Sequence, residues 1–375
     1  MRLLIEELWS ATREGKPLAR RAFFLWKLLC CLRYLYAAGL YLRSKAWGYK
    51  TIPRAADNLP VIAVGNLTVG GTGKSVFVQW LIEHAGWSHP AVLLRGYKST
   101  TLKKESVFVV GDGKKVFGNA TLVGDEPLQV AQRGVPVAIG KNRFDALTAL
   151  QAIPSLFIDL VILDDGYQTH SIFKDFTILL VDARAPLGNG YLFPAGPLRE
   201  HDYSRADVII FTHADEVLVS LASLKERYFP DFPSNQIFGG KHVFAGFINN
   251  EYQKIKLNAQ PPVLLCSGIA KPENLEETVR RTGMRVMEHC VFPDHHSYSL
   301  GDVEKLITQA QQLGVSFLIT TEKDWTKLQE FQSLFVIRGI TSLIAKIEFE
   351  FLTSREYAVF VALLRRRLMQ GGAAA

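Results

Sequence analysis

A glycine-rich segment ending in lysine and serine, Gly65–Ser75 (GNLTVGGTGKS), carries the clearest chemistry in this chain of 375 residues. It follows the apolar run Leu59–Val64, and a helical pattern extends from Lys74 to His84. A strand, a glycine-rich turn and a helix that starts at Gly-Lys-Ser form a phosphate cradle, because backbone N–H groups and the helix N-terminus face the anion. We therefore expect Lys74 to reach the β- and γ-phosphates of a nucleoside triphosphate and Ser75 to offer its hydroxyl to Mg²⁺.

The expected nucleotide-binding residues follow one another along this loop: Thr68, Val69, Gly70, Gly71, Thr72, Gly73, Lys74 and Ser75. The usual pattern has a glycine six residues before the lysine, where this chain has Thr68. The alternative is a glycine-rich turn with a chance lysine. A strand, loop and helix in the required order favour the phosphate cradle.

A pair of aspartates closes a second apolar run, Phe157–Asp165 (FIDLVILDD). Magnesium-assisted phosphoryl transfer needs a carboxylate at the end of a buried strand beside the phosphate loop. Asp164 and Asp165 are the predicted metal ligands, and Asp165 is also a candidate catalytic residue. The alternative is an ordinary surface turn after the strand.

Asp125 is the candidate general base, in the segment Gly124–Pro127 (GDEP) after the strand-like run Thr121–Val123. A carboxylate exposed at the end of a strand can accept the proton of an attacking hydroxyl. Asp-Glu-Pro is an equally good helix start. Arg95 also follows a strand, where its guanidinium would contact either a phosphate or a structural carboxylate.

Two further loops carry polar side chains. The glycine- and proline-rich segment Phe193–Glu200 can hold Arg199 over a phosphate and Glu200 near a metal or a hydroxyl, or it is a plain surface turn. The segment Pro293–Tyr298 places His295 and His296 before a helix. Zinc would need a third ligand that the spacing does not supply, so a histidine that orients a carboxylate is the better interpretation.

The elements that would position these residues alternate between apolar strands and helices, which is typical of a parallel α/β sheet. Strands of a first set are expected at Ala91–Leu94, Val135–Ile139, Leu156–Leu163, Thr177–Val181 and Val208–Phe211. After a linker near 230–242, a second set is expected at Val243–Phe247, Val263–Cys266, Arg285–Val286 and Phe317–Thr320, with helices at Asn274–Thr282 and Gly301–Gln312. A last amphipathic helix, Arg355–Met369, would pack on either domain.

The predicted organisation is a membrane-interface segment at 1–45, a P-loop domain at 46–235, a smaller α/β domain at 243–350 and a helix with a tail at 351–375. Hydrophobic residues make up 48% of the chain, which is enough to form two cores. The net charge of +7 suits an acidic partner. The cysteines Cys30, Cys31, Cys266 and Cys290 have no metal or disulfide spacing, so a reducing compartment is expected.

The N-terminal region predicts an apolar and aromatic helix over residues 17–42, interrupted by Lys27 and Arg33. These charges argue against a helix that spans a bilayer. Basic residues beside a wide apolar surface are typical of a helix that lies in the membrane interface. The alternative is a helix packed on the protein's own core.

Seven motifs stand in a specific order along the chain, and together they resemble the tetraacyldisaccharide 4′-kinase family of lipid A biosynthesis. They are VGNLTVGGTGKS from Val64, RGY from Arg95, GDEP from Gly124, LDDGYQ from Leu163, FPAGPLRE from Phe193, FPDHH from Phe292 and TTEKD from Thr320. The resemblance covers residues 26–327. The family also has threonine at the position of Thr68, and usually threonine where this chain has Ser75. The family's histidine after Asp-Asp-Gly-Phe-Gln is replaced by Thr169, with His170 one residue later.

The resemblance implies transfer of the ATP γ-phosphate to the 4′-hydroxyl of tetraacyldisaccharide 1-phosphate on the cytoplasmic face of a bacterial inner membrane. It implies a P-loop NTPase-like fold of two α/β domains, with the active site between them and no nucleic-acid partner. Asp125 would take the hydroxyl proton and His295, on the other domain, would support it. We expect Asn66, Arg95, Arg199 and Glu200 to contact the substrate.

Two other functions fit parts of the sequence. One is a soluble P-loop kinase that phosphorylates a different hydroxyl. The other is a nucleotide-dependent switch protein, in which the turn Thr212–Asp215 (THAD) would recognise a base.

Overall fold

The computed structural model describes residues 2–48, 51–56, 59–97, 99–257 and 260–371. Contacts divide the chain into two compact units. The first unit comprises Met1–Arg95, Gly140–His242 and Phe349–Ala375, and the second comprises Gly96–Ile139 and Val243–Glu348. Neither unit is one continuous stretch of chain, so the boundaries differ from those expected at 46–235 and 243–350.

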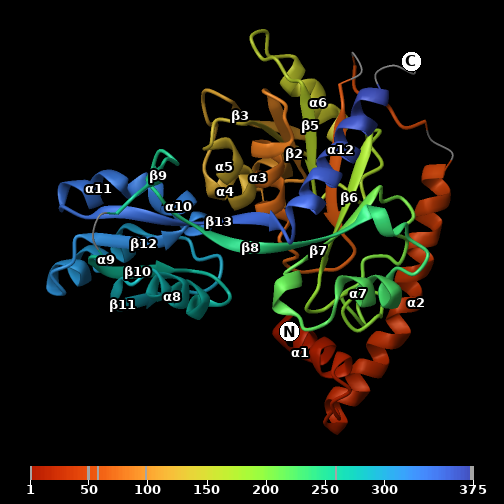
Figure 1. Cartoon of the computed structure of the whole chain (residues 1–375), viewed down its shortest axis with the longest axis horizontal. Coiled ribbons are helices and arrows are strands. Elements are labelled where there is room, and N and C mark those ends of the chain that lie inside the picture. The colour runs from red at the N-terminus through yellow and green to blue at the C-terminus, as the bar shows by residue number, and fades with distance from the viewer. Residues whose placement is uncertain (1, 49–50, 57–58, 98, 258–259, 372–375) are drawn as a thin grey trace. The chain divides into compact units, whose positions relative to one another are not determined.

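A parallel sheet forms the centre of the first unit (Figure 1). Its strand order is β8-β7-β6-β1-β5-β2, and all these neighbouring pairs are parallel. The strands are β1 (Val61–Asn66), β2 (Pro90–Leu94), β5 (Leu160–Asp164), β6 (Phe176–Asp182), β7 (Val208–Thr212) and β8 (Ile237–Ile248). The strands β1, β2, β5 and β7 are buried along their whole length, as their continuous apolar runs predict.

The register of β1 and β5 sets the position of the polar motifs. Val64 on β1 lies opposite Asp164 on β5. Because parallel strands end at the same edge of a sheet, the loop that follows β1 and the aspartate pair that closes β5 emerge side by side.

Helices and aromatic side chains complete the first unit. The helices are α3 (Lys74–His84), α6 (Arg143–Gln151), α7 (Leu221–Tyr228) and α12 (Ser354–Gly371). The predicted helix over 74–84 is confirmed. Phe360 of α12 packs 6.2 Å from Phe77 of α3 and 6.4 Å from Phe176 of β6, measured between ring centroids. The last helix, drawn in blue beside β6 in Figure 1, therefore belongs to the first unit.

The N-terminal region forms two helices, α1 (Arg2–Arg13) and α2 (Arg20–Gly48). The sequence indicated one helix from Pro17 to Leu42; α1 was not expected, and α2 begins three residues later and extends further. In the described part of the chain, Arg20–Ala46 is the one helix whose length and apolar composition suffice to cross a membrane. Leu8 and Leu29 of this pair are buried with Ala195 in a small core.

The second unit is built on the strand order β11-β10-β12-β13-β8. The strands are β10 (Pro262–Ser267), β11 (Arg285–Val291), β12 (Phe317–Thr321) and β13 (Thr341–Phe351), and β9 (Lys254–Ile255) pairs antiparallel with β8. The helices are α8 (Pro272–Arg281), α9 (Leu300–Gln312), α10 (Glu322–Leu328) and α11 (Gln332–Ile337). Trp325 and Phe335 are fully buried in one of its cores.

Residues 96–139 contribute to the second unit the elements β3 (Val107–Asp112), α4 (Ala120–Val123), α5 (Asp125–Ala131) and β4 (Pro136–Gly140). The run Thr121–Val123, expected as a strand, lies in α4. Asn119 caps this turn, because its side-chain oxygen accepts a hydrogen bond from Leu122 N at 3.1 Å. Short 3₁₀ helices lie at Thr101–Lys103, Ala214–Glu216, Ser234–Gln236 and Gln329–Phe331.

Candidate active site

The glycine-rich loop joins the end of β1 to the start of α3. Gly73 stands at the N-terminus of α3 with a φ of 76°, and Gly70 has a φ of 127°. Both values favour glycine. A Cβ at Gly73 would lie 2.3 Å from the ring of His242, whereas a Cβ at Gly70 or Gly71 would meet nothing within 4 Å. The loop is therefore packed against the protein on one side and open at its tip, as a phosphate cradle requires.

Hydrogen bonds from outside hold the loop in this shape. Val69 N donates to Pro197 O at 2.7 Å, and Thr212 Oγ1 donates to Thr72 O at 3.1 Å. The side-chain amide of Asn66 donates to Thr68 O at 2.8 Å. Asn66 is fully buried, so in this structure it braces the loop.

Three of the predicted residues meet at one cluster of charges, which we call the phosphate-loop centre. Arg199 Nη1 donates to both carboxylate oxygens of Asp165, at 2.8 and 2.9 Å. Lys74 Nζ lies 3.8 Å from Asp165 Oδ1. Burial acts to raise the pKa of Asp165, but the Lys74 and Arg199 cations outweigh it and hold that pKa below its usual value.

Arg143 is a fourth member of this centre that the sequence reasoning missed. It is 1% exposed at the start of α6, and its charge also lowers the pKa of Asp165. The sequence does contain a signal for Arg143: the segment Gly140–Arg143 follows an apolar strand, just as Arg95 follows β2. Arg95 itself is exposed at the carboxyl end of β2.

The donors expected for a metal suit magnesium. Asp164 is 5% exposed at the end of β5, and Ser75 begins α3 directly after Lys74. Among the described residues, no group of three or more His, Cys, Asp or Glu side chains could hold a metal ion. Mg²⁺ fits a site with few protein ligands, because it is usually bound by one or two protein carboxylates together with phosphate oxygens and water. Hydroxyl and carboxylate oxygens are also the donors it prefers.

Glu200 is paired with a neighbouring arginine. Its carboxylate forms an ion pair with Arg205, and Arg205 Nη1 lies 3.4 Å from His170 Nε2. Burial, together with Arg205 and Lys174, lowers the pKa of His170 to about 4. His170, which follows the position of the family's histidine, is thus kept neutral near pH 7.

A second cluster of charges lies in the second unit around Asp125, and we call it the Asp125 centre. Asp125 opens α5, and its Oδ2 lies 3.1 Å from His295 Nδ1. Lys327 Nζ approaches the same oxygen at 3.0 Å and donates to His296 O at 2.9 Å. Asp125 and His295 thus belong to one compact unit, whereas the sequence reasoning placed them on different domains.

Lys327 was missed by the sequence reasoning. It is 6% exposed on α10, and no spacing relates it to Asp125 along the chain. The packing of α10 on α5 brings the two together, and Arg133, two residues after the end of α5, forms an ion pair with Glu322 of α10.

The two neighbouring histidines have different surroundings. His295 has a φ of 62° and faces Asp125. His296 Nε2 lies 3.2 Å from Asp302 Oδ2, at the start of α9. The structure thus assigns His295, and not His296, to the Asp125 centre.

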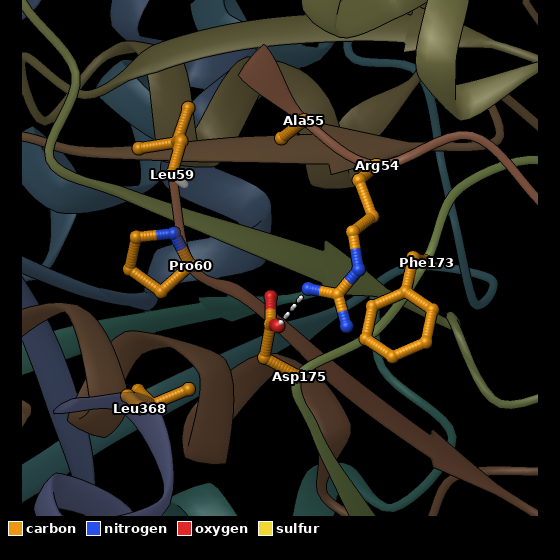
Figure 2. Close-up of a pocket in the computed structure, with 7 residues that line it drawn as sticks. All are labelled: Arg54, Ala55, Leu59, Pro60, Phe173, Asp175 and Leu368. Carbon is orange, nitrogen blue, oxygen red and sulfur yellow. Dashed lines mark hydrogen bonds and ion pairs between the residues drawn. The ribbon is translucent and has the colours of Figure 1, made fainter. Parts of the chain in front are cut away.

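Figure 2 shows a pocket of the first unit that no residue of the phosphate loop lines. It is lined by Arg54, Ala55, Leu59, Pro60, Phe173, Asp175 and Leu368. Arg54 stacks over Phe173 and pairs with Asp175 at 3.2 Å, while Val61 N donates to Asp175 at 2.9 Å. Val61 is the first residue of β1, so the pocket lies at the amino edge of the sheet. Ligands of such sheets bind at the carboxyl edge.

Comparisons with known proteins agree on one family. A family model described as tetraacyldisaccharide-1-P 4′-kinase matches residues 25–367. The tetraacyldisaccharide 4′-kinase of Geobacter sulfurreducens is 35% identical over 328 residues, which cover 85% of this chain and 89% of the relative. The enzyme of the same name from Syntrophus aciditrophicus is 32% identical over 324 residues, covering 82% and 85%.

A solved structure has the same fold. It is described as the "apo" form of LpxK from Aquifex aeolicus in complex with ATP. It matches with a TM-score of 0.71 at 24% identity, covering 92% of this chain and 99% of that one. The family match over most of the chain and the relatives above 30% identity lead to one conclusion: this chain belongs to the tetraacyldisaccharide-1-P 4′-kinase family.

Proposed function

We propose that this chain transfers the γ-phosphate of ATP to the 4′-hydroxyl of tetraacyldisaccharide 1-phosphate, giving the bis-phosphorylated lipid A precursor. The family match carries the choice of reaction. The observation that supports it in the structure is the phosphate-loop centre, where Lys74, Asp165 and Arg199 meet beside a glycine loop that is open at its tip. Phosphoryl transfer depends mainly on such positioned charges.

Lys74 and the loop amides would neutralise the β- and γ-phosphates. In the structure Lys74 and Arg199 face Asp165, which stays ionised because both cations lower its pKa. Both cations are therefore held in position by the same carboxylate. Charges that are fixed in advance cost little reorganisation during the reaction.

Ser75, Asp164 and Asp165 are the residues that would hold magnesium, directly or through its water shell. When bound, Mg²⁺ would neutralise the negative charge that develops on the phosphate groups during transfer. Lys74 and Arg199 both contact Asp165, so a magnesium ion held there would share this carboxylate with two cations.

Asp125 would accept the proton of the acceptor hydroxyl. His295 and Lys327 both approach its Oδ2, so they fix the direction of the carboxylate and leave the proton to Oδ1. A sugar hydroxyl is a weak nucleophile, and its alignment contributes more to the rate than the strength of the base. His295 and Lys327 are thus proposed to orient Asp125.

The substrate contacts expected from the sequence divide into two groups. Arg95 is exposed at the carboxyl edge of the sheet and Arg199 is half-buried there, so both remain proposed contacts for phosphate or sugar. Asn66 and Glu200 are buried and already bonded to Thr68 O and Arg205. Their proposed contribution is to hold the loop and Arg205 in place.

The proposal places the protein on the cytoplasmic face of the bacterial inner membrane, held there by α2. At about 100° per residue, Phe24, Leu28, Leu35 and Leu42 fall within about 40° of one another on the helix. All four are exposed, with Leu35 72% exposed. The buried Leu29 lies on another face of α2. An exposed apolar stripe suits a substrate whose four acyl chains stay in a bilayer.

Labelled ATP tests the proposal directly. Purified protein is incubated in detergent with γ-labelled ATP, Mg²⁺ and tetraacyldisaccharide 1-phosphate, and the lipid product is separated. Labelled lipid that retains its 1-phosphate is the expected result. Protein that binds ATP but labels no lipid, or that labels a water-soluble acceptor equally well, would contradict the proposal. Slow release of phosphate without any labelled acceptor would indicate a nucleotide switch.

A further inference from the structure

The loop between β6 and β7 touches both the N-terminal helices and the phosphate-loop centre. We call residues 187–199 the bridging loop. The bridging loop, the helices α1 and α2 and the phosphate loop all lie in the first unit.

Several bonds attach the helices to one side of the bridging loop. Trp9 Nε1 of α1 donates to Pro194 O at 3.0 Å, and Asn189 Nδ2 donates to Thr12 Oγ1 at 2.9 Å. The Trp26 ring packs edge-on against Tyr191, with ring centroids 5.7 Å apart. These contacts come from both α1 and α2.

The other side of the bridging loop holds the phosphate loop. Pro197 O accepts the hydrogen bond from Val69 N at 2.7 Å, and Arg199 N donates to Leu67 O at 2.7 Å. A bridge also pairs Thr68 with Leu198. The phosphate loop therefore takes part of its shape from the bridging loop.

Arg199 is the residue where these contacts converge. Its backbone N–H is bonded to the phosphate loop, and its side chain to Asp165. Its backbone carbonyl accepts a hydrogen bond from the Tyr36 hydroxyl of α2 at 3.0 Å. The membrane-facing helix thus contacts the residue that sets the charge around Asp165.

The bridging loop has little room to absorb a displacement. A Cβ at Gly196 would lie 2.1 Å from Asn189 Oδ1, and a Cβ at Gly188 would lie 2.1 Å from Pro197 Cγ. Closely packed segments transmit a shift, because no void exists into which they can relax.

We propose that Tyr36 is a positioning residue and that the seating of α1 and α2 on the bridging loop sets the geometry of Arg199 and the phosphate loop. The helix pair is then part of the catalytic apparatus, in addition to attaching the protein to the membrane. The kinetic part of this inference rests on the proposed function, whereas the structural coupling does not. Because coupling is reciprocal, nucleotide at the phosphate loop must also stabilise the docked helices.

Tyr36→Phe is the central variant, since it removes one hydroxyl and keeps the ring. Tyr41→Phe is its matched control: it lies on the same helix and is 62% exposed. We expect kcat of Tyr36→Phe to fall about three- to tenfold, the effect of one hydrogen bond. Co-sedimentation with phosphatidylethanolamine–phosphatidylglycerol vesicles should equal that of Tyr41→Phe. Trp9→Phe, which removes the bond to Pro194, should act in the same direction.

A double-mutant cycle separates positioning from general weakening of the fold. If Tyr36 acts through Arg199, Tyr36→Phe has no further effect on kcat in an Arg199→Ala background. An undiminished loss in that background would overturn the positioning role, as would equal kcat values for Tyr36→Phe and Tyr41→Phe.

Amide hydrogen exchange tests the coupling without any turnover. ADP should slow exchange in α1 and α2 of the unmodified protein, and Tyr36→Phe should reduce this protection while Tyr41→Phe retains it. Exchange in the helices that ignores ADP would overturn the inference. If ADP protects the helices but no lipid is phosphorylated, the proposed function fails and the coupling stands.

Discussion

The carboxylate of Asp125 lies 3.1 Å from Nδ1 of His295, although 170 positions separate the two residues along the chain. Asp125 starts α5 and His295 stands on a loop with a φ of 62°, so both positions are set by the backbone around them. His295 N donates to Gly268 O at 3.2 Å, which ties its loop to the end of β10. The pair is therefore held in place from both sides.

Replacing Asp125 by Asn should remove the proton acceptor and keep the shape of the site. We expect kcat to fall by a factor of about 10² to 10⁴, the range found for general acid–base groups. The KM for ATP should change little, because Asp125 is not one of the residues of the phosphate-loop centre. Steady-state kinetics with the lipid acceptor give both quantities.

Glu126→Gln is the matched control for that measurement. Glu126 is the next residue along α5, carries the same charge and is exposed. A loss of kcat as large as that of Asp125→Asn would contradict the assignment of the base to Asp125.

Lys327→Met should destabilise the second unit. Lys327 is buried and bonded to both Asp125 and the carbonyl of His296, so its removal takes one of two partners from Asp125 and breaks the bond to that carbonyl. Such a loss costs about 1–3 kcal/mol of unfolding free energy. Lys323→Met is the control on the same helix. Its pair with Asp294 is more exposed and contributes about 0–1 kcal/mol. Urea unfolding measures the unfolding free energy of both variants, and equal losses of this free energy would contradict the prediction.

Much of the fold could be predicted because short, continuous apolar runs in the sequence indicate buried strands. The strands at 61–66, 160–164 and 208–212 and the helix at 74–84 follow directly from pattern. The differences from the expected elements and units have physical causes. Thr121–Val123 has the β-branched composition of a strand, but Asn119 caps a helical turn there. The grouping of 96–139 with the second unit depends on helix packing between α5 and α10, which no local pattern encodes.

The candidate site could be predicted in part for the same reason. Lys74 opens the helix that follows β1, and Asp165 directly follows β5. Because β1 and β5 are parallel neighbours, the topology of the sheet brings the two residues together. Lys327 and Tyr36 reach the site through tertiary packing and have no local signature. Asn66 and Glu200 have the right chemistry, but burial and bonds to protein partners direct them inward.

His295→Ala and His296→Ala should have different consequences. His295 contacts Asp125, so its loss should lower kcat at least tenfold with little change in stability, because its side chain is 45% exposed. His296 contacts Asp302, which caps α9. Its loss should mainly lower the unfolding free energy, by about 1 kcal/mol. Measurements of kcat and of urea unfolding for both variants test this. A large loss of kcat in His296→Ala and a loss of stability in His295→Ala would contradict the two assignments.

The apolar stripe of α2 should control membrane binding. Replacing Phe24, Leu28 and Leu35 together by Gln removes the exposed apolar contacts, and binding to phosphatidylethanolamine–phosphatidylglycerol vesicles should fall more than tenfold. The control replaces three exposed apolar residues elsewhere, Leu218, Val336 and Ile337, by Gln. Co-sedimentation measures both. Binding that is equal in the two variants would argue against α2 as the membrane contact.

Two half-buried histidines should make the protein less stable in mild acid. Burial and the neighbouring His213 and Arg184 lower the pKa of His242 to about 4, and His170 has a similarly lowered pKa.

Between about pH 6.5 and 4 the unfolded chain protonates both imidazoles while the native state leaves them neutral. The unfolded state then binds more protons, so the unfolding free energy falls as the pH drops through this window. Allowing for partial exposure, each histidine accounts for on the order of 1 kcal/mol at pH 5.

Urea unfolding at pH 7.5 and pH 5.0 measures this fall, and His242→Gln should reduce it because one of the two groups is gone. Since His242 packs against Gly73, its protonation also places a positive charge under the phosphate loop. A fall that is identical in unmodified protein and in His242→Gln would show that folding does not lower the pKa of His242.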